Sequence, residues 1–235
     1  MIVTLGQHRA VDKCLDLLQE VYEQLGVTVL RLPSKTSDAV FHRDVAAWTP
    51  FGLIKCRMGK ISRRWEPEIW FHDVGITSVY RVGTPDTFEG ADLLWLNRRE
   101  AVLACGSRTN TSGASAIFKW LDEEKVLVHQ VNLPVWHEQH LLGLANAING
   151  QFIVCDGQEP WTTDITNSGV IPSTDYDMKG PNWVEIGDAV VVGDCCGQTI
   201  EVLQARGKRV LSIDISELLA FGGGIACATG IVSYD

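Results

Sequence analysis

A cysteine, a histidine and three aspartates stand at matching places along the chain, each close to the start of an apolar run. Asp44 lies in FHRDVAAW, Asp92 in FEGADLLW, His140 in EQHLLGL and Asp188 in EIGDAVVV, at steps of 48 residues. Cys227 follows after a step of 39 residues, in GGGIACATGIV. A thiol, an imidazole and carboxylates suit covalent catalysis, in which a neighbouring cation favours the thiolate and the histidine transfers protons.

The segments between these positions contain a second pattern, which predicts the elements that support them. Helix-like stretches lead, in most cases through a glycine, into β-branched runs, as expected for a capped helix followed by a buried strand. The pattern is clear at residues 11–26, 111–123 and 198–207, and weaker at 65–75 and 161–172. Five α/β units of this kind predict a ring in which equivalent strand ends converge on the axis and form a polar pocket.

Six segments resemble, in the same order, those of the guanidine-modifying (amidinotransferase) superfamily, and most of all the dimethylarginine dimethylaminohydrolases and related bacterial hydrolases. They are SDAVFHRD (37–44), CRMGKISRRWEPE (56–68), FEGADLLWL (88–96), SRTN (107–110), QHLLGL (139–144) and GGGIAC (222–227). Their order and spacing give the resemblance its weight, and it extends from about residue 11 to the end. It implies a single pentein domain over residues 1–235, an α/β propeller of five pseudo-symmetric repeats around a central pocket.

The resemblance implies a role for each matching residue of the site. Cys227 is expected to be the nucleophile, His140 the general acid and base, and Glu89 the carboxylate that orients the histidine. Asp44 is expected to hold the substrate guanidinium, and Asp38 to add a polar contact from the same loop. Taken alone, Cys227 could equally be a small buried core residue, as most cysteines without a disulfide are.

Further candidates come from the remaining motifs. Arg63 and Arg108 match the two arginines that hold the substrate α-carboxylate in the methylarginine hydrolases. Asp92, three residues after Glu89, is a candidate substrate contact, with a turn or backbone partner as the alternative. Asp188 fits the repeat, and it too could be purely structural.

Several features depart from the family pattern. Ala91 stands where the family often has a second glycine, and Leu142 stands where arginine deiminases have an aspartate. Arg43 occupies a place where some methylarginine hydrolases have a glutamate, so the identity of the guanidino substrate stays open. The N-terminal strand and loop that can lie over the substrate are expected to be shortened.

The implied activity is hydrolysis of a guanidino C–N bond, in which arginine or an N-substituted arginine gives citrulline and an amine through a thiouronium on Cys227. Amidino transfer and arginine or agmatine deiminase-type activity use the same intermediate and are alternatives. A non-catalytic pentein binding protein is disfavoured, because the whole catalytic set is present. No metal or organic cofactor is expected, since the histidines of HEQH (137–140) lack the spacing of the zinc motif HExxH.

Composition limits the partners and the compartment. The 235-residue chain has a net charge of −9, which disfavours nucleic acid because its binding depends on clustered Lys and Arg. The seven cysteines include no CxxC pair, and the first residues lack the basic start and apolar core of a secretion signal. No apolar run approaches the roughly 20 residues that span a bilayer. We therefore expect a cytoplasmic monomer or homodimer that binds a small guanidino compound and neither membrane nor nucleic acid.

Overall fold

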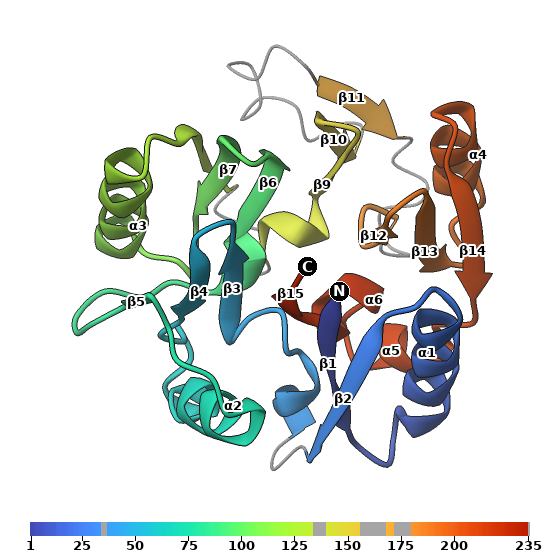
Figure 1. The fold of residues 1–235 in the computed structure, drawn as a ribbon, viewed down its shortest axis with the longest axis horizontal. Helices are drawn as coiled ribbons and strands as arrows, with labels where there is room; N and C mark the ends of the chain where they lie inside the picture. Colours follow the sequence, from blue (N-terminus) through green and yellow to red (C-terminus); the bar gives the residue numbers. More distant parts are fainter. Residues whose placement is uncertain (34–36, 134–139, 156–167, 172–179, 235) are drawn as a thin grey trace.

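Five three-stranded sheets form a ring in the part of the chain that the structure describes (Figure 1). The computed structural model describes residues 1–33, 37–133, 140–155, 168–171 and 180–234. The sheets comprise β3 (Ala46–Thr49), β4 (Gly52–Lys55) and β5 (Tyr80–Arg81); β6 (Leu93–Asn97), β7 (Glu100–Cys105) and β8 (Leu127–Asn132); β9 (Ala145–Ile148), β10 (Gln151–Cys155) and β11 (Ser168–Ile171); β12 (Val184–Ile186), β13 (Ala189–Gly193) and β14 (Arg209–Ile213); and β15 (Gly230–Ser233), β1 (Ile2–Gln7) and β2 (Thr28–Pro33).

Every sheet repeats one topology. The strand nearest the ring axis pairs antiparallel with the middle strand, and the middle strand pairs parallel with the outer strand. The fifth sheet joins the two ends of the chain, because β15 pairs with β1 and places Ile2 opposite Ser233. The predicted propeller of five pseudo-symmetric repeats is therefore confirmed.

Helices connect the middle and outer strands of four sheets and lie on the outside of the ring (Figure 1). A parallel strand pair requires such a crossover. These helices are α1 (Asp12–Gln24), α2 (Glu66–Val74), α3 (Thr111–Glu123) and α4 (Gly197–Ala205), which match four of the five predicted stretches. Of the fifth stretch, 161–172, residues 161–167 and 172 lie outside the described residues, and Ser168–Ile171 form the strand β11. No described helix is long and apolar enough to cross a bilayer.

In the part of the chain that the structure describes, β3, β6, β9 and β15 are each preceded by short helical turns, and most of the candidate site residues lie on or beside these turns. The middle strands behind them are buried: all residues of β13 and four consecutive residues of β7 are shielded from solvent. A strand covered on both faces requires such a continuous apolar run. The turns are η1 (Ser37–Val40), η3 (Gly90–Asp92), η4 (Leu141–Gly143), α5 (Ser216–Ala220) and α6 (Ile225–Ala228), while η2 (Ile61–Arg63) precedes α2.

Two positions of the predicted repeat differ from the structure. Cys227 lies on the helical turn α6 rather than on a strand, and β15 begins three residues after it. Asp188 does not precede an inner strand but lies in the turn between β12 and β13, with 79% of its side chain exposed. The reason is local, because Gly187 has φ of +61° and folds the segment into a hairpin. The polar residue that stands before the inner strand β12 is Asn182, two residues before Val184.

The start of α3 depends on a close approach between Gly113 and Thr87. The side chain of Asn110 caps the helix by accepting a hydrogen bond from the Gly113 N–H at 2.8 Å. A Cβ at Gly113 would lie 1.9 Å from the Thr87 carbonyl oxygen. We therefore expect Gly113→Ala to lower the free energy of unfolding by about 1–3 kcal/mol, since the backbone must move.

Chemical denaturation would measure this loss, and Gly197→Ala at the start of α4 is the matched control. A Cβ at Gly197 would meet nothing within 4 Å, so this change should be neutral or stabilise the fold by up to about 1 kcal/mol. Equal losses in the two variants would show that the close approach at Gly113 is not the cause.

Candidate active site

Three of the predicted site residues, from three different sheets, meet beside the ring axis. Asp44 precedes β3, Glu89 precedes β6 through η3, and His140 precedes β9 through η4. Glu89 and His140 are 51 positions apart in sequence, yet their side chains are in direct contact. The repeat of the fold thus brings distant residues together, as expected for equivalent strand ends around one axis.

His140 and Glu89 form the central pair of the site. Nε2 of His140 lies 2.6 Å from Oε2 of Glu89, whose side chain is fully buried. The second oxygen of Glu89 accepts a hydrogen bond from the backbone N–H of Gly59 at 2.8 Å. Because both oxygens are held, the carboxylate has one orientation, and this geometry lets it fix the orientation of the imidazole.

Asp44 lies on the other side of the imidazole. Its Oδ1 is 3.7 Å from Nδ1 of His140, which is too long for a hydrogen bond. This oxygen is buried and has no hydrogen-bond partner among the described residues. The second oxygen accepts a hydrogen bond from Arg63 at 2.8 Å. A buried carboxylate oxygen in this state is a strong acceptor for an incoming N–H donor.

The charges of the central pair support each other. Burial opposes protonation of His140, but the carboxylates of Asp44, Asp92 and Glu89 outweigh it and raise the pKa of His140 to about 10. Burial would raise the pKa of Glu89, but the hydrogen bond and charge of His140, together with Arg63, lower it to about 2. The pair is therefore an imidazolium and a carboxylate at neutral pH.

Arg63 is buried within the site and spans two carboxylates. Its guanidinium bonds Asp44 at 2.8 Å and Glu66 at 2.8–2.9 Å. Burial disfavours its charged form, but these two carboxylates outweigh that effect and raise its pKa. In this arrangement Arg63 positions Asp44, and its expected contact with a substrate carboxylate stays a prediction. Glu66, at the start of α2, was not singled out in the sequence, where it reads as an ordinary acidic first-turn residue.

The structure describes the two remaining predicted substrate contacts, Arg108 and Asp38, in less detail. Arg108 is half-buried, and its backbone packs against Gly59, the residue that holds Glu89. This places Arg108 beside the site without defining what its guanidinium binds. Asp38 belongs to η1, and its side chain lies outside the described part of the structure.

Asp92 ties together the loops that carry the site. It is fully buried, and its two oxygens accept hydrogen bonds from the Thr109 hydroxyl at 2.6 Å and the Leu141 N–H at 2.9 Å. Thr109 in turn accepts a hydrogen bond from the N–H of Glu89. Both oxygens are thus occupied within the protein, which favours the structural alternative for Asp92 over substrate contact.

The buried carboxyl of Asp92 should make stability depend on pH. Burial raises its pKa to about 6, above the value of about 4 expected in the unfolded chain. A folded-state pKa above the unfolded one gives a contribution that is complete below pH 4 and is lost as pH rises through 6. Asp92→Asn should remove this contribution, so the difference in free energy of unfolding from wild type should change by about 1–3 kcal/mol between pH 4 and 7. Urea denaturation across this range would test it, and a constant difference would contradict it.

Cys227 is half-buried on α6 and is in contact with a residue absent from the sequence-based candidates. Nδ2 of Asn182 lies 3.1 Å from its Sγ, and the same nitrogen donates to the carbonyl oxygen of Leu142 at 3.2 Å. Leu142 is two residues from His140, so Asn182 links the cysteine to the histidine turn. One feature of the sequence could have pointed to Asn182, namely its position just before an inner strand. The 48-residue step assigned that position to Asp188 instead.

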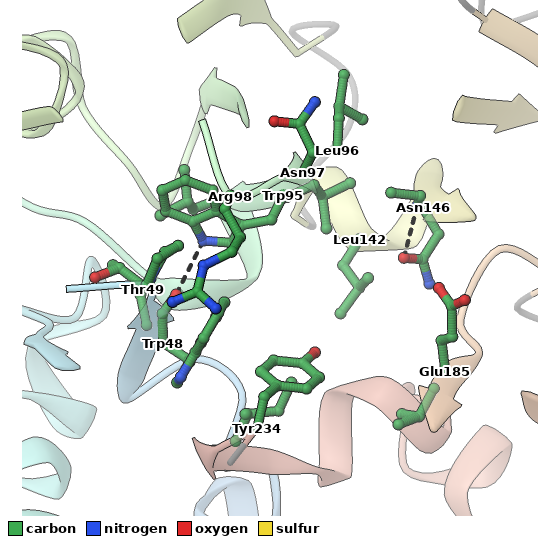
Figure 2. Close-up of a pocket in the computed structure, with 18 of the residues that line it drawn as sticks. Trp48, Thr49, Trp95, Leu96, Asn97, Arg98, Leu142, Asn146, Glu185 and Tyr234 are labelled. Carbon is green, nitrogen blue, oxygen red and sulfur yellow. Dashed lines mark hydrogen bonds between the residues drawn. The ribbon is translucent and has the colours of Figure 1, made fainter. Parts of the chain in front are cut away.

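A cavity of 560 Å³ lies on the axis at the opposite ends of the inner strands. Figure 2 shows Trp48, Trp95 and Tyr234 around it, from the segments of β3, β6 and β15. None of the catalytic candidates lines this cavity. Arg43 adjoins both regions, because it lines the cavity while its backbone N–H donates to the Cys227 carbonyl at 3.2 Å. The predicted central pocket is thus present, but its described lining comes from the other ends of the strands.

The central residues could also surround a small cation. One ligand atom from each of Asp44, Glu89 and His140 lies within 4.8 Å of the others. Nε2 of His140 is already held by Glu89 at 2.6 Å, however, and the open Oδ1 of Asp44 can accept a hydrogen bond from an N–H donor. An organic cation with N–H donors is the better match for these acceptors.

Known proteins resemble this chain in sequence and in fold. No protein-family profile matches the chain. The N(G),N(G)-dimethylarginine dimethylaminohydrolase of Pseudomonas aeruginosa is 25% identical over 236 residues, covering 95% of this chain and 86% of that protein. A cysteine-to-serine mutant of the enzyme from this organism, complexed with citrulline, matches with a TM-score of 0.85 and 21% identity over 97% of both chains.

A second kind of enzyme shares the fold. The substrate-bound N-terminal domain of ArgZ, a cyanobacterial arginine dihydrolase, matches with a TM-score of 0.83 and 16% identity over 97% of this chain and 96% of that one. The fold is that of the penteins. The sequence similarity to the dimethylarginine dimethylaminohydrolase extends across nearly the whole chain and agrees with the resemblance to the guanidine-modifying superfamily.

Proposed function

We propose that the protein is a cysteine-dependent hydrolase that cleaves a C–N bond of arginine or an N-substituted arginine, giving citrulline and an amine. The main support is the imidazolium–carboxylate pair of His140 and Glu89 beside the buried Asp44 oxygen that has no partner among the described residues. The activities named for its relatives, dimethylarginine dimethylaminohydrolase and arginine dihydrolase, support the same chemistry.

The charge of the site favours a cationic substrate. Within the described residues of the site, the three carboxylates of Asp44, Glu66 and Glu89 face the two cationic groups of Arg63 and His140. The excess negative charge and the open acceptor on Asp44 suit the N–H donors of a guanidinium. Bound there, the guanidinium carbon would be held in a fixed geometry for attack by the thiolate.

In the first half-reaction, the Cys227 thiolate attacks the guanidinium carbon and forms a neutral tetrahedral adduct. His140 donates its proton to the leaving nitrogen, the C–N bond breaks and a neutral amine departs. The transferred proton is the one on Nδ1, since Nε2 is held by Glu89. A cationic thiouronium is left on Cys227, and His140 is left neutral.

In the second half-reaction, neutral His140 accepts a proton from water while the oxygen adds to the thiouronium carbon. The positive charge of the thiouronium disfavours earlier reprotonation of the imidazole. The adduct then expels the Cys227 thiolate, loses its hydroxyl proton to solvent and is released as the ureido product. The amine released earlier takes up one proton in solution and becomes an ammonium ion. One water is consumed per turnover, and His140 is again protonated.

A panel of guanidino compounds would test the proposal. Purified protein would be incubated with arginine, methylated arginines and agmatine, and the ureido product and released amine would be quantified. At least one compound should give both products in equal amounts, and EDTA should leave the rate unchanged. If Arg108 binds the substrate carboxylate, arginine-type substrates should exceed agmatine in kcat/KM by about 10-fold or more. No ureido product from any compound, at protein concentrations close to that of substrate, would overturn the proposal.

A further inference from the structure

Asn182 stands in the fourth sheet where the catalytic candidates stand in the others. It comes just before the inner strand β12, as Asp44 comes just before β3. Its side chain is buried, with 2% exposure, and it is directed at Cys227, which lies on α6 just before the inner strand β15 of the fifth sheet. The five-fold repeat thus supplies a polar residue at this place in the fourth sheet too, and that residue is an amide.

The hydrogen bonds of this amide determine which of its atoms faces the sulfur. Oδ1 accepts the backbone N–H of Cys227 at 3.2 Å, and Nδ2 donates to the Leu142 carbonyl at 3.2 Å. Rotating the amide by half a turn would place oxygen against the Leu142 carbonyl and nitrogen against the Cys227 N–H. Both contacts would then be repulsive, so Nδ2 is the atom that lies 3.1 Å from Sγ.

The surroundings hold Asn182 in this position. The side chain of Asn146 donates to the carbonyl oxygens of Pro181 at 2.7 Å and Trp183 at 3.0 Å, on either side of Asn182. On the other side, a Cβ at Gly224 would lie 2.6 Å from Oδ1 of Asn182. The third glycine of the GGG segment is therefore what allows the amide to reach the cysteine.

We propose that Asn182 is a further catalytic residue, whose Nδ2–H donates a hydrogen bond to the Cys227 thiolate. This inference rests on the proposed function, in which Cys227 is the nucleophile. The hydrogen bond stabilises the thiolate before attack and again when it leaves the second tetrahedral adduct. Because the same amide binds the Cys227 N–H and the Leu142 carbonyl, it also fixes the cysteine relative to the histidine turn.

Two substitutions test the role of the donor. Asn182→Asp keeps an acceptor for the Cys227 N–H but presents an oxygen to the sulfur, and Asn182→Ala removes the group. The rate at which iodoacetamide alkylates Cys227 would be measured from pH 5 to pH 10 by peptide mass spectrometry. The midpoint of this curve should rise by about one pH unit in Asn182→Ala and further in Asn182→Asp. The acidic limb of kcat/KM for an active substrate should move in the same direction.

Two controls separate this effect from a general loss of structure. Cys105 is also half-buried, so its alkylation in the same molecules should be unchanged. Thr229 lies two residues after Cys227 in the sequence. Thr229→Val removes its buried hydrogen bonds to Tyr22 and Ile225 and leaves the contacts of the Cys227 sulfur unchanged. This variant should lower the melting temperature and leave the alkylation midpoint of Cys227 in place.

The outcomes distinguish this proposal from the proposed function. An active wild type whose folded Asn182 variants keep the same midpoint would overturn the role of Asn182 alone. A shift as large in Thr229→Val as in Asn182→Ala would also overturn it. A wild-type Cys227 that reacts no faster than Cys105, in a protein that turns over no guanidino compound, would overturn both proposals.

Discussion

Cys227→Ser is expected to lower kcat for every guanidino substrate by at least about 10³-fold while leaving the fold intact. The change replaces one atom on a helical turn whose backbone bonds do not involve the sulfur. A hydroxyl is scarcely ionised at neutral pH, so it supplies almost no nucleophile for a resonance-stabilised guanidinium carbon. Turnover at saturating substrate measures the loss, and thermal unfolding tests the fold.

Cys105→Ser is the matched control, because Cys105 is also half-buried but lies at the end of β7. This variant should retain wild-type turnover. Rapid acid quenching of the wild type should trap an adduct on the peptide that contains Cys227, and the serine variant should show none. Substantial turnover by Cys227→Ser would rule out covalent catalysis by this residue.

Glu89→Gln is expected to lower kcat by about 10²–10⁴-fold, the range typical of impaired general acid–base catalysis. The variant replaces a fully buried carboxylate that holds Nε2 of His140 at 2.6 Å. Without this charge, the pKa of His140 should fall from about 10 toward its ordinary value. The imidazole would then be neutral over more of the pH range and less able to protonate the leaving amine.

The sign of the pH effect follows from the raised pKa of His140. The stability contributed by the protonated imidazole is complete below pH 6.5 and is lost as pH rises through about 10. In Glu89→Gln this loss, and the alkaline limb of kcat, should both move to lower pH. Histidine NMR titration measures the pKa of His140, which sets the pH of the stability loss, and a pH–rate profile measures the alkaline limb of kcat.

Glu100→Gln provides a control of the same chemistry elsewhere in the fold. Glu100 bonds Nε2 of His129 at 2.9 Å, at the paired edges of β7 and β8. Its substitution should leave kcat and the titration of His140 unchanged. A Glu89→Gln variant that kept the wild-type profile would exclude Glu89 as the residue that controls the imidazole.

Much of the fold could be predicted because its signals are local. The apolar spacing of residues 11–26 and 111–123 predicted α1 and α3, and helix periodicity depends only on neighbours three and four residues apart. The 48-residue step revealed the ring, since each unit repeats one pattern of turn, strand and helix. The resemblance then pointed to Glu89 and His140, which the structure brings into contact.

Other features depended on contacts that no local pattern encodes. Asp188 fits the 48-residue spacing but does not precede an inner strand. Gly187, with its left-handed backbone conformation, folds this segment into a hairpin, and Asn182 occupies the position before the inner strand. The pairing of Arg63 with Asp44 and Glu66 arises where η2, α2 and the turn before β3 converge.

By itself, the sequence determined the repeat and the helices. It also determined that a cysteine, a histidine and carboxylates occur in the order typical of a known superfamily. Only the tertiary structure showed the direct contact by which Glu89 holds the histidine, that an amide contacts the cysteine, and that the axial cavity lies at the other ends of the inner strands. The physical reason is that hydrogen bonds act over about 3 Å, whereas these partners lie about 45–50 residues apart along the chain. Their meeting depends on how the five sheets close around the axis.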